Sequence, residues 1–202
     1  MSEPRRLRLT HRGAAAVAVG VLLVLATFSG CSGQDSDRTE RPSAESSTAA
    51  ADEETSAAVD VLVQTGLDQM TAGDRAAARG TFANVLALDP DNTLGHYNLG
   101  VIEQQTGRDA EAMASYDAAL ATTPDHVPSL FNKAILLETT DLPAAVDLYR
   151  TVVDLDDQRA AAHMRLGFAL IHLGEATEGE ALLAEGLRLD PAMAGVEAPR
   201  YD

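Results

Sequence analysis

The sequence predicts an all-α protein, built as a solenoid of about four helix-turn-helix repeats. Hydrophobic residues make up 46% of the 202 residues and many are alanine, whereas aromatic residues make up 4% and tryptophan is absent. Helices form and pack well with such small side chains, while sheets favour β-branched and aromatic residues. The strand signals, which are alternating Val, Ile, Thr or Tyr and an Asn-Gly turn, are also missing. The third observation is a pattern that returns with a period of about 34 residues.

The charge of the chain argues against one class of partner. The formal net charge is −16, and residues 1–30 hold four arginines and one glutamate. Eleven basic and 30 acidic residues therefore remain after residue 30, a net charge of −19. A domain this acidic repels phosphate backbones and anionic lipid head groups, so we expect no nucleic-acid partner.

Residues 1–30 have the pattern of a secretory signal peptide. Four arginines between Arg5 and Arg12 precede an uncharged apolar run at 13–28, and small residues follow at Ser29 and Gly30. A basic region, a short apolar region and a break at small residues are typical of such signals. Cys31 comes next and is the single cysteine of the chain, so no intramolecular disulfide can form.

The segment Phe28-Ser29-Gly30-Cys31 resembles the lipobox of bacterial lipoproteins, with Phe28 in place of the usual leucine. The resemblance implies cleavage before Cys31 and acylation of Cys31. The alternative is an uncleaved single-pass signal anchor, although its apolar run lies near the lower limit of about 17–25 residues for a membrane span. In both cases the arginines stay in the cytoplasm, which predicts an extracytoplasmic, membrane-attached protein.

A linker is predicted between the signal and the repeats, at residues 31–56. Residues 32–55 contain no large apolar side chain. Such a segment buries too little surface to offset the entropy lost on ordering, so the composition predicts a disordered spacer.

The repeating pattern places small and aromatic residues at fixed offsets. The clearest copy has Leu99-Gly100, Ala112, Tyr116, Ala119 and Pro124, and the copy before it has Gly66, Ala78, Phe82, Val85 and Pro90. The later copies have Ala134, Ala145, Tyr149, Val152 and Asp157, and then Leu166-Gly167, Gly179, Leu183, Gly186 and Pro191. The small residues are expected where the two helices of a repeat cross, and the prolines where the second helix ends.

This pattern resembles the tetratricopeptide repeat (TPR) over residues 59–191. The resemblance implies a right-handed superhelix at residues 57–191, with repeats at about 59–92, 93–126, 127–159 and 160–192. The C-terminal tail, residues 192–202, is too short and broken for the usual additional helix, which predicts an incompletely covered last repeat.

The resemblance also implies a concave groove lined by the first helix of each repeat. The groove residues that it predicts are Tyr97, Asn98, Val101, Phe131, Asn132, Ile135, Met164, Arg165 and Phe168. Family members use the position of Asn98 and Asn132 to hydrogen-bond an extended peptide, and side-chain amides can both donate and accept. We expect the apolar residues to hold a mainly hydrophobic segment and Arg165 to be available for a carboxylate. The alternative is that these residues only pack within the repeats or cap local polar groups.

The sequence therefore predicts a membrane-tethered binding module for a protein or peptide partner. No HExxH, P-loop or glycine-rich phosphate loop is present, so we expect no enzyme activity, cofactor or metal site. His96 and His163 are expected to pack. Two other functions remain open: a self-assembling structural protein that associates through the last repeat, and an accessory subunit of an envelope complex.

Overall fold

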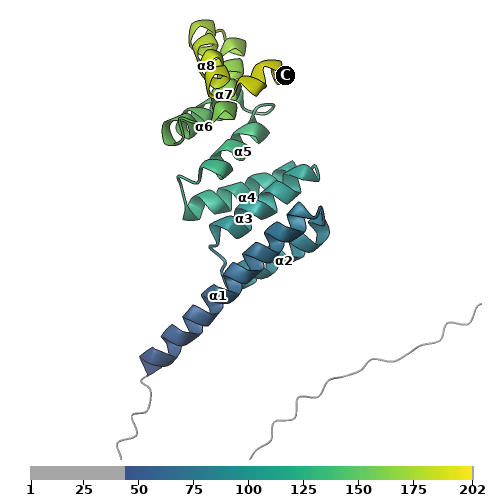
Figure 1. Ribbon diagram of the computed structural model, residues 1–202, viewed down its shortest axis with the longest axis vertical. Helices are drawn as coiled ribbons and strands as arrows, with labels where there is room; N and C mark the ends of the chain where they lie inside the picture. Colours follow the sequence, from purple (N-terminus) through teal and green to yellow (C-terminus); the bar gives the residue numbers. More distant parts are fainter. Residues whose placement is uncertain (1–43, 202) are drawn as a thin grey trace, which may run out of the picture. The chain divides into compact units, whose positions relative to one another are not determined.

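Figure 1 shows the computed structural model of the chain, which describes the backbone of residues 44–201 and the side chains of residues 52–201. The predicted signal segment and Cys31 lie outside the described residues. The described part forms eight α-helices and a C-terminal 3-10 helix: α1 (Ala44–Thr71), α2 (Arg75–Leu88), α3 (Thr93–Gln105), α4 (Asp109–Thr122), α5 (Val127–Leu137), α6 (Leu142–Leu155), α7 (Ala160–His172), α8 (Ala176–Leu189) and η1 (Pro191–Gly195). This confirms the predicted all-α class.

The helices are arranged as four stacked helix-turn-helix repeats. Consecutive helices form antiparallel pairs, α1 with α2, α3 with α4, α5 with α6 and α7 with α8 (Figure 1). Neighbouring pairs contact each other through α2 and α3, α4 and α5, and α6 and α7. The predicted repeat architecture is therefore confirmed.

The turns inside the repeats follow from local sequence. Gly73, Gly107 and Gly174 end the first helices of repeats one, two and four with φ of 80°, 72° and 90°, a region that glycine enters without steric cost. Repeat three has no glycine there, and its helix α5 has 11 residues against 13 in α3 and α7. The side chain of Asp141 instead accepts a hydrogen bond from the backbone N–H of Ala144 and starts α6.

Aromatic and small residues fill the core at equivalent places. The side chains of Phe82, Tyr116 and Tyr149 are fully buried between the helices of repeats one, two and three. In repeat four, a Cβ on Gly167 would lie 2.8 Å from the carbonyl oxygen of Gly179, and a Cβ on Gly179 would lie 2.6 Å from that of Gly167. The α7 and α8 backbones therefore approach each other too closely to admit a methyl group.

The predicted disorder of residues 44–55 is wrong, because α1 begins at Ala44. Composition alone indicated that this stretch buries little surface, and residues 52–58 are indeed exposed. The stretch is rich in alanine and glutamate, which favour helix. Extending an existing helix requires no new nucleation, so α1 continues outward from the packed first repeat.

The C-terminal tail folds back onto the repeats. After η1, which contacts α8, residues 196–201 continue without helix or strand. The ring of Tyr201 packs against a core cluster that includes Ala134, Tyr149 and Leu170. The tail is too short for a further helix, as predicted, but it covers part of the last two repeats.

Candidate binding groove

The structure brings four of the predicted groove residues to one pocket. Phe131 from α5 and Met164, Arg165 and Phe168 from α7 line a cavity of about 220 Å³. Its remaining walls include tail residues, namely Met193, Val196, Glu197 and Pro199. The chain's own tail therefore lies over the predicted groove at repeats three and four.

Arg165 is bound within the chain. Its Nη1 donates hydrogen bonds of 2.8 and 2.7 Å to Oε1 and Oε2 of Glu138, a side chain that is buried. The hydroxyl of Tyr149 donates to Oε1 of the same carboxylate at 2.7 Å. The expectation that Arg165 is free for a ligand carboxylate is therefore wrong, because α7 brings it against the carboxylate at the end of α5.

The pKa values of this network follow from burial and from the central carboxylate. Burial raises the pKa of the Tyr149 hydroxyl, and the negative charge of Glu138 raises it further. Burial disfavours the charge of Arg165, but the hydrogen bonds and charge of Glu138 outweigh this effect and raise its pKa. Tyr149 therefore stays a donor and Arg165 stays a cation around one buried anion.

An equivalent network joins repeats two and three. The hydroxyl of Tyr116 donates to Oε1 of Gln104 at 2.7 Å, and Gln104 occupies the position in repeat two that Glu138 occupies in repeat three. The side chain of Asn132 lies beside the Tyr116 hydroxyl and opposes the rise of its pKa, as Arg165 does for Tyr149. We call each set an inter-repeat polar bridge: Gln104, Tyr116 and Asn132 in one, and Glu138, Tyr149 and Arg165 in the other.

The two predicted peptide-binding amides are engaged in the chain. Asn98 is buried and its Nδ2 donates to the carbonyl oxygen of Leu94 at 2.8 Å. Asn132 is half-buried, and its side chain lies beside the hydroxyls of Tyr97 and Tyr116, where it opposes the rise of their pKa values. The local capping alternative therefore describes Asn98, whereas Asn132 connects neighbouring repeats.

The aromatic residues are partly packed. The ring of Tyr97 lies 6.2 Å from that of Tyr116 and meets His126 edge-on at 5.2 Å. Burial raises the pKa of Tyr97 and lowers that of His126. The ring of Phe131 packs against Tyr149 at 5.7 Å.

The remaining apolar groove residues differ in burial. Met164 is only 4% exposed and fills the space beside Gly186. Ile135 is half-buried and packs against a core cluster. Val101 and Phe168 are also half-buried, so part of their apolar surface faces solvent or the tail. Apolar surface of the kind that a partner could cover is therefore present in repeats two and four.

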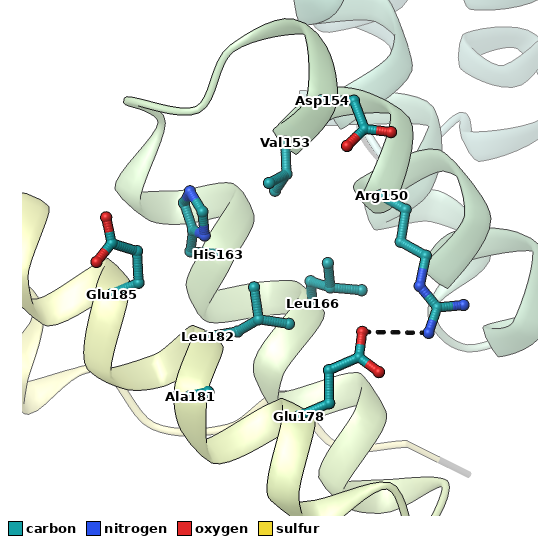
Figure 2. A pocket seen from close by; sticks show the side chains of 9 residues that line it. All are labelled: Arg150, Val153, Asp154, His163, Leu166, Glu178, Ala181, Leu182 and Glu185. Atoms are coloured by element: carbon teal, nitrogen blue, oxygen red, sulfur yellow. Dashed lines mark hydrogen bonds and ion pairs between the residues drawn. The ribbon is translucent and has the colours of Figure 1, made fainter.

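A second pocket of about 480 Å³ lies between α6, α7 and α8 (Figure 2). Its apolar floor is formed by Val153, Leu166 and Leu182, and Arg150 and Glu178 face each other at its edge, 3.4 Å apart. His163 lines it but is 5% exposed, with Nε2 bound to the carbonyl oxygen of Asp157 at 2.9 Å. His163 thus packs, as the sequence predicts.

Sequence reasoning missed the covering of the groove by the tail and the contacts of Glu138. The spacing of Glu138, one repeat after Gln104, was a usable signal, because both stand before an aromatic residue that reaches back across the repeat. Nothing in the repeat pattern indicated the position of Tyr201, which lies beyond the last copy.

Two further features are absent from the part of the chain that the structure describes. Residues 52–201 contain no group of three or more His, Cys, Asp or Glu side chains placed to hold a metal ion. No helix between residues 44 and 201 combines the length and apolar character of a membrane span.

Two family models match the chain, at residues 63–127 and 136–197, and both describe the tetratricopeptide repeat. No curated protein matches by sequence.

Solved structures show the same fold. MamA from Desulfovibrio magneticus is similar at 20% identity and a TM-score of 0.58, over 68% of this chain and 78% of that one. PilF from Pseudomonas aeruginosa is similar at 22% identity and a TM-score of 0.61, over 68% of this chain and 64% of that one. YrrB, described as a protein with an unusual peptide-binding site, is similar at 17% identity and a TM-score of 0.56, over 67% of this chain and 71% of that one. At these identities the likeness establishes the fold of the described repeats.

Proposed function

Since the chain belongs to the tetratricopeptide-repeat family, we propose that it is a binding module that holds an extended protein segment against the first helices of its repeats. The half-buried apolar side chains along α3, α5 and α7 carry this proposal, above all Val101 and Phe168. The peptide-binding site named for YrrB, which shares the fold, supports the same use of it. Because fold alone does not determine function, the side chains decide what is bound.

The chemistry of the groove favours an apolar segment without strong negative charge. Arg165 is already neutralised by Glu138, and the Asn98 amide is bound to its own helix. Recognition therefore depends on burying apolar surface, which contributes about 25 cal/mol per Å². The net charge of −16 disfavours an acidic partner over a neutral or basic one.

A matched pair of variants tests this proposal. Val101→Glu places a charge on the groove, and Leu155→Glu places the same charge on the second helix of repeat three, where Leu155 is 48% exposed. After crosslinking in membranes from the producing cells, the native chain and Leu155→Glu should capture the same partner, and Val101→Glu should lose it. Circular dichroism confirms that both variants are folded. Equal capture by all three chains would contradict groove binding.

We further propose that the module is tethered to the extracytoplasmic face of the cell membrane through acylated Cys31, with an uncleaved signal anchor as the alternative. The support is the sequence of residues 5–31, namely the arginines, the apolar run and the lipobox-like end. Two acyl chains or more hold a protein stably at a membrane, whereas one does not.

Cys31→Ser tests the tether. If Cys31 is acylated, the variant loses incorporation of labelled palmitate and migrates as the unprocessed chain. Unchanged labelling and migration would reject acylation. Native chain that is unlabelled yet remains with membranes after a carbonate wash would favour the signal anchor.

A further inference from the structure

The C-terminal tail makes apolar contacts with the groove. Met193, Val196 and Pro199 line the 220 Å³ cavity together with Phe131 and Phe168. The ring of Tyr201 lies 4.9 Å from that of His172 and packs against the core cluster of repeats three and four. Apolar residues of the tail thus occur at every third position from Met193 to Pro199, with an aromatic residue shortly after.

The same tail is weakly held in other respects. Residues 196–201 form no helix or strand, and Val196 remains 46% exposed. The hydroxyl of Tyr201 is buried without a hydrogen-bond partner, an arrangement that works against burial because water would otherwise solvate the group. Burial accordingly raises the pKa of Tyr201.

Repeat four lacks the side chains that form an inter-repeat polar bridge. In repeat four, Ile171 occupies the position of Glu138, because the turn of repeat three is one residue short, and Leu183 occupies the position of Tyr149. Leucine cannot donate the hydrogen bond that Tyr149 gives to Glu138, and residues 192–202 do not continue the repeat pattern. The ring of Tyr201 contacts His172, the residue after the position that repeats two and three use for an inter-repeat polar bridge.

We propose that tail residues 193–201 are a built-in occupant of the groove at repeats three and four, and that a partner segment must displace them to bind there. This inference rests on the proposed function, and it adds the chemistry of the partner. The displacing segment is extended and carries apolar side chains about three residues apart. It also places an aromatic side chain against His172 and, unlike Tyr201, buries no unpaired hydroxyl there.

The test uses the full chain and a fluorescein-labelled peptide with the sequence of residues 192–202. In the native chain the attached tail competes with the peptide at an effective concentration of about a millimolar. The double variant Met193→Ala, Tyr201→Ala releases the tail, so the Kd of the peptide should fall at least about tenfold relative to the native chain. Arg200→Ala, a change at an exposed neighbour, should leave the Kd at the native value.

A second variant tests the tail without loosening it. Tyr201→Phe removes the unpaired hydroxyl and keeps the ring, so the tail should hold more tightly and the peptide should bind more weakly than to the native chain. Adding Phe168→Ala to the double variant should remove the gain in affinity, because Phe168 lines the cavity.

Several results would overturn the inference. One is equal peptide affinity for all chains. Another is no binding to the double variant, which would show that the tail is only a structural cover. A native dimer that the double variant converts to a monomer would show that the tail lies in a second copy. The proposed function is judged separately, because Val101 lies in repeat two, away from the cavity residues, and its variant is read by partner capture.

Discussion

A buried carboxylate is the residue-scale feature that most affects the groove. Glu138 is 6% exposed and accepts from both Arg165 and Tyr149. A buried charge is tolerated where an opposite charge and hydrogen bonds satisfy it, and removal of one partner leaves the other uncompensated. The main role of Arg165 is therefore to compensate the buried charge of Glu138 and so stabilise the fold.

Arg165→Met should lower the free energy of unfolding by about 3 kcal/mol, because it leaves Glu138 without its cation. Urea unfolding at neutral pH, followed by circular dichroism at 222 nm, measures the loss. Adding Glu138→Gln should recover much of it, since the amide oxygen still accepts from Tyr149. A loss below about 0.5 kcal/mol, the range of an ordinary surface pair, would show that Glu138 is solvated after all.

The sequence indicated which face Arg165 occupies, but not what it binds. Its place at the sixth position of a first helix follows from counting the repeat. Its partner depends on where α5 ends, and α5 is shorter than α3 and α7 because the turn of repeat three lacks glycine and one residue. The repeat pattern does not say which buried side chain Arg165 meets, and the spacing of Glu138 one repeat after Gln104 was the only signal for this tertiary contact.

At the scale of elements, the crossing of the two helices is set by very small residues. Repeats one, two and three have Ala78, Ala112 and Ala145 at the crossing, all fully buried. Repeat four has Gly167 opposite Gly179, with no room for a Cβ on either. Helix pairs with smaller contact residues pack closer. The sequence therefore predicted where the two helices cross and which small residue lies at the crossing in each repeat.

Gly179→Ala should destabilise the chain by about 2 kcal/mol, because the added methyl would lie against backbone that cannot yield easily. Gly80→Ala is the matched control, because Gly80 lies inside α2 and a Cβ there meets nothing within 4 Å. That change should stabilise the chain by about 0.5–1 kcal/mol through the better helix propensity of alanine. Thermal unfolding of both variants measures whether the change in stability is negative for Gly179→Ala and positive for Gly80→Ala. Equal changes in stability would contradict the close approach of α7 and α8.

Across the whole molecule, the four tyrosines share one behaviour. Tyr97, Tyr116, Tyr149 and Tyr201 all have a raised pKa, and burial is the main cause for each. The folded chain thus holds all four phenols neutral, while the unfolded chain ionises them near pH 10. Their stabilising contribution is complete below about pH 10 and is lost as the pH rises through the raised folded values.

The free energy of unfolding should therefore fall as the pH rises from about 10 toward the raised folded values, because the unfolded state releases its phenolic protons there. Urea titrations across this range measure the fall. Absorbance at 295 nm should show little phenolate until the helical signal is lost. Phenolate that forms gradually in a fully helical chain would show that the tyrosines are accessible to solvent.

The architecture as a whole could be predicted from the sequence, but the start of α1 and the path of the C-terminal tail could not. Residues that recur once in each repeat determine the stacked helix pairs. The start of α1 at Ala44 depends on helix propensity carried outward from the first repeat. The path of residues 196–201 depends on contacts with residues earlier in the chain, namely His172 and the core cluster of repeats three and four, and no local pattern encodes it.

The unpaired hydroxyl of Tyr201 also has a consequence for the rate at which a partner binds. If the tail must leave before a partner enters, the observed association rate cannot rise without limit as partner concentration increases; it levels off at the rate of tail departure. A loosely held tail leaves often, so that ceiling is high and binding is fast. Tyr201→Phe would lower the ceiling, and stopped-flow mixing would record a slower plateau with the same partner.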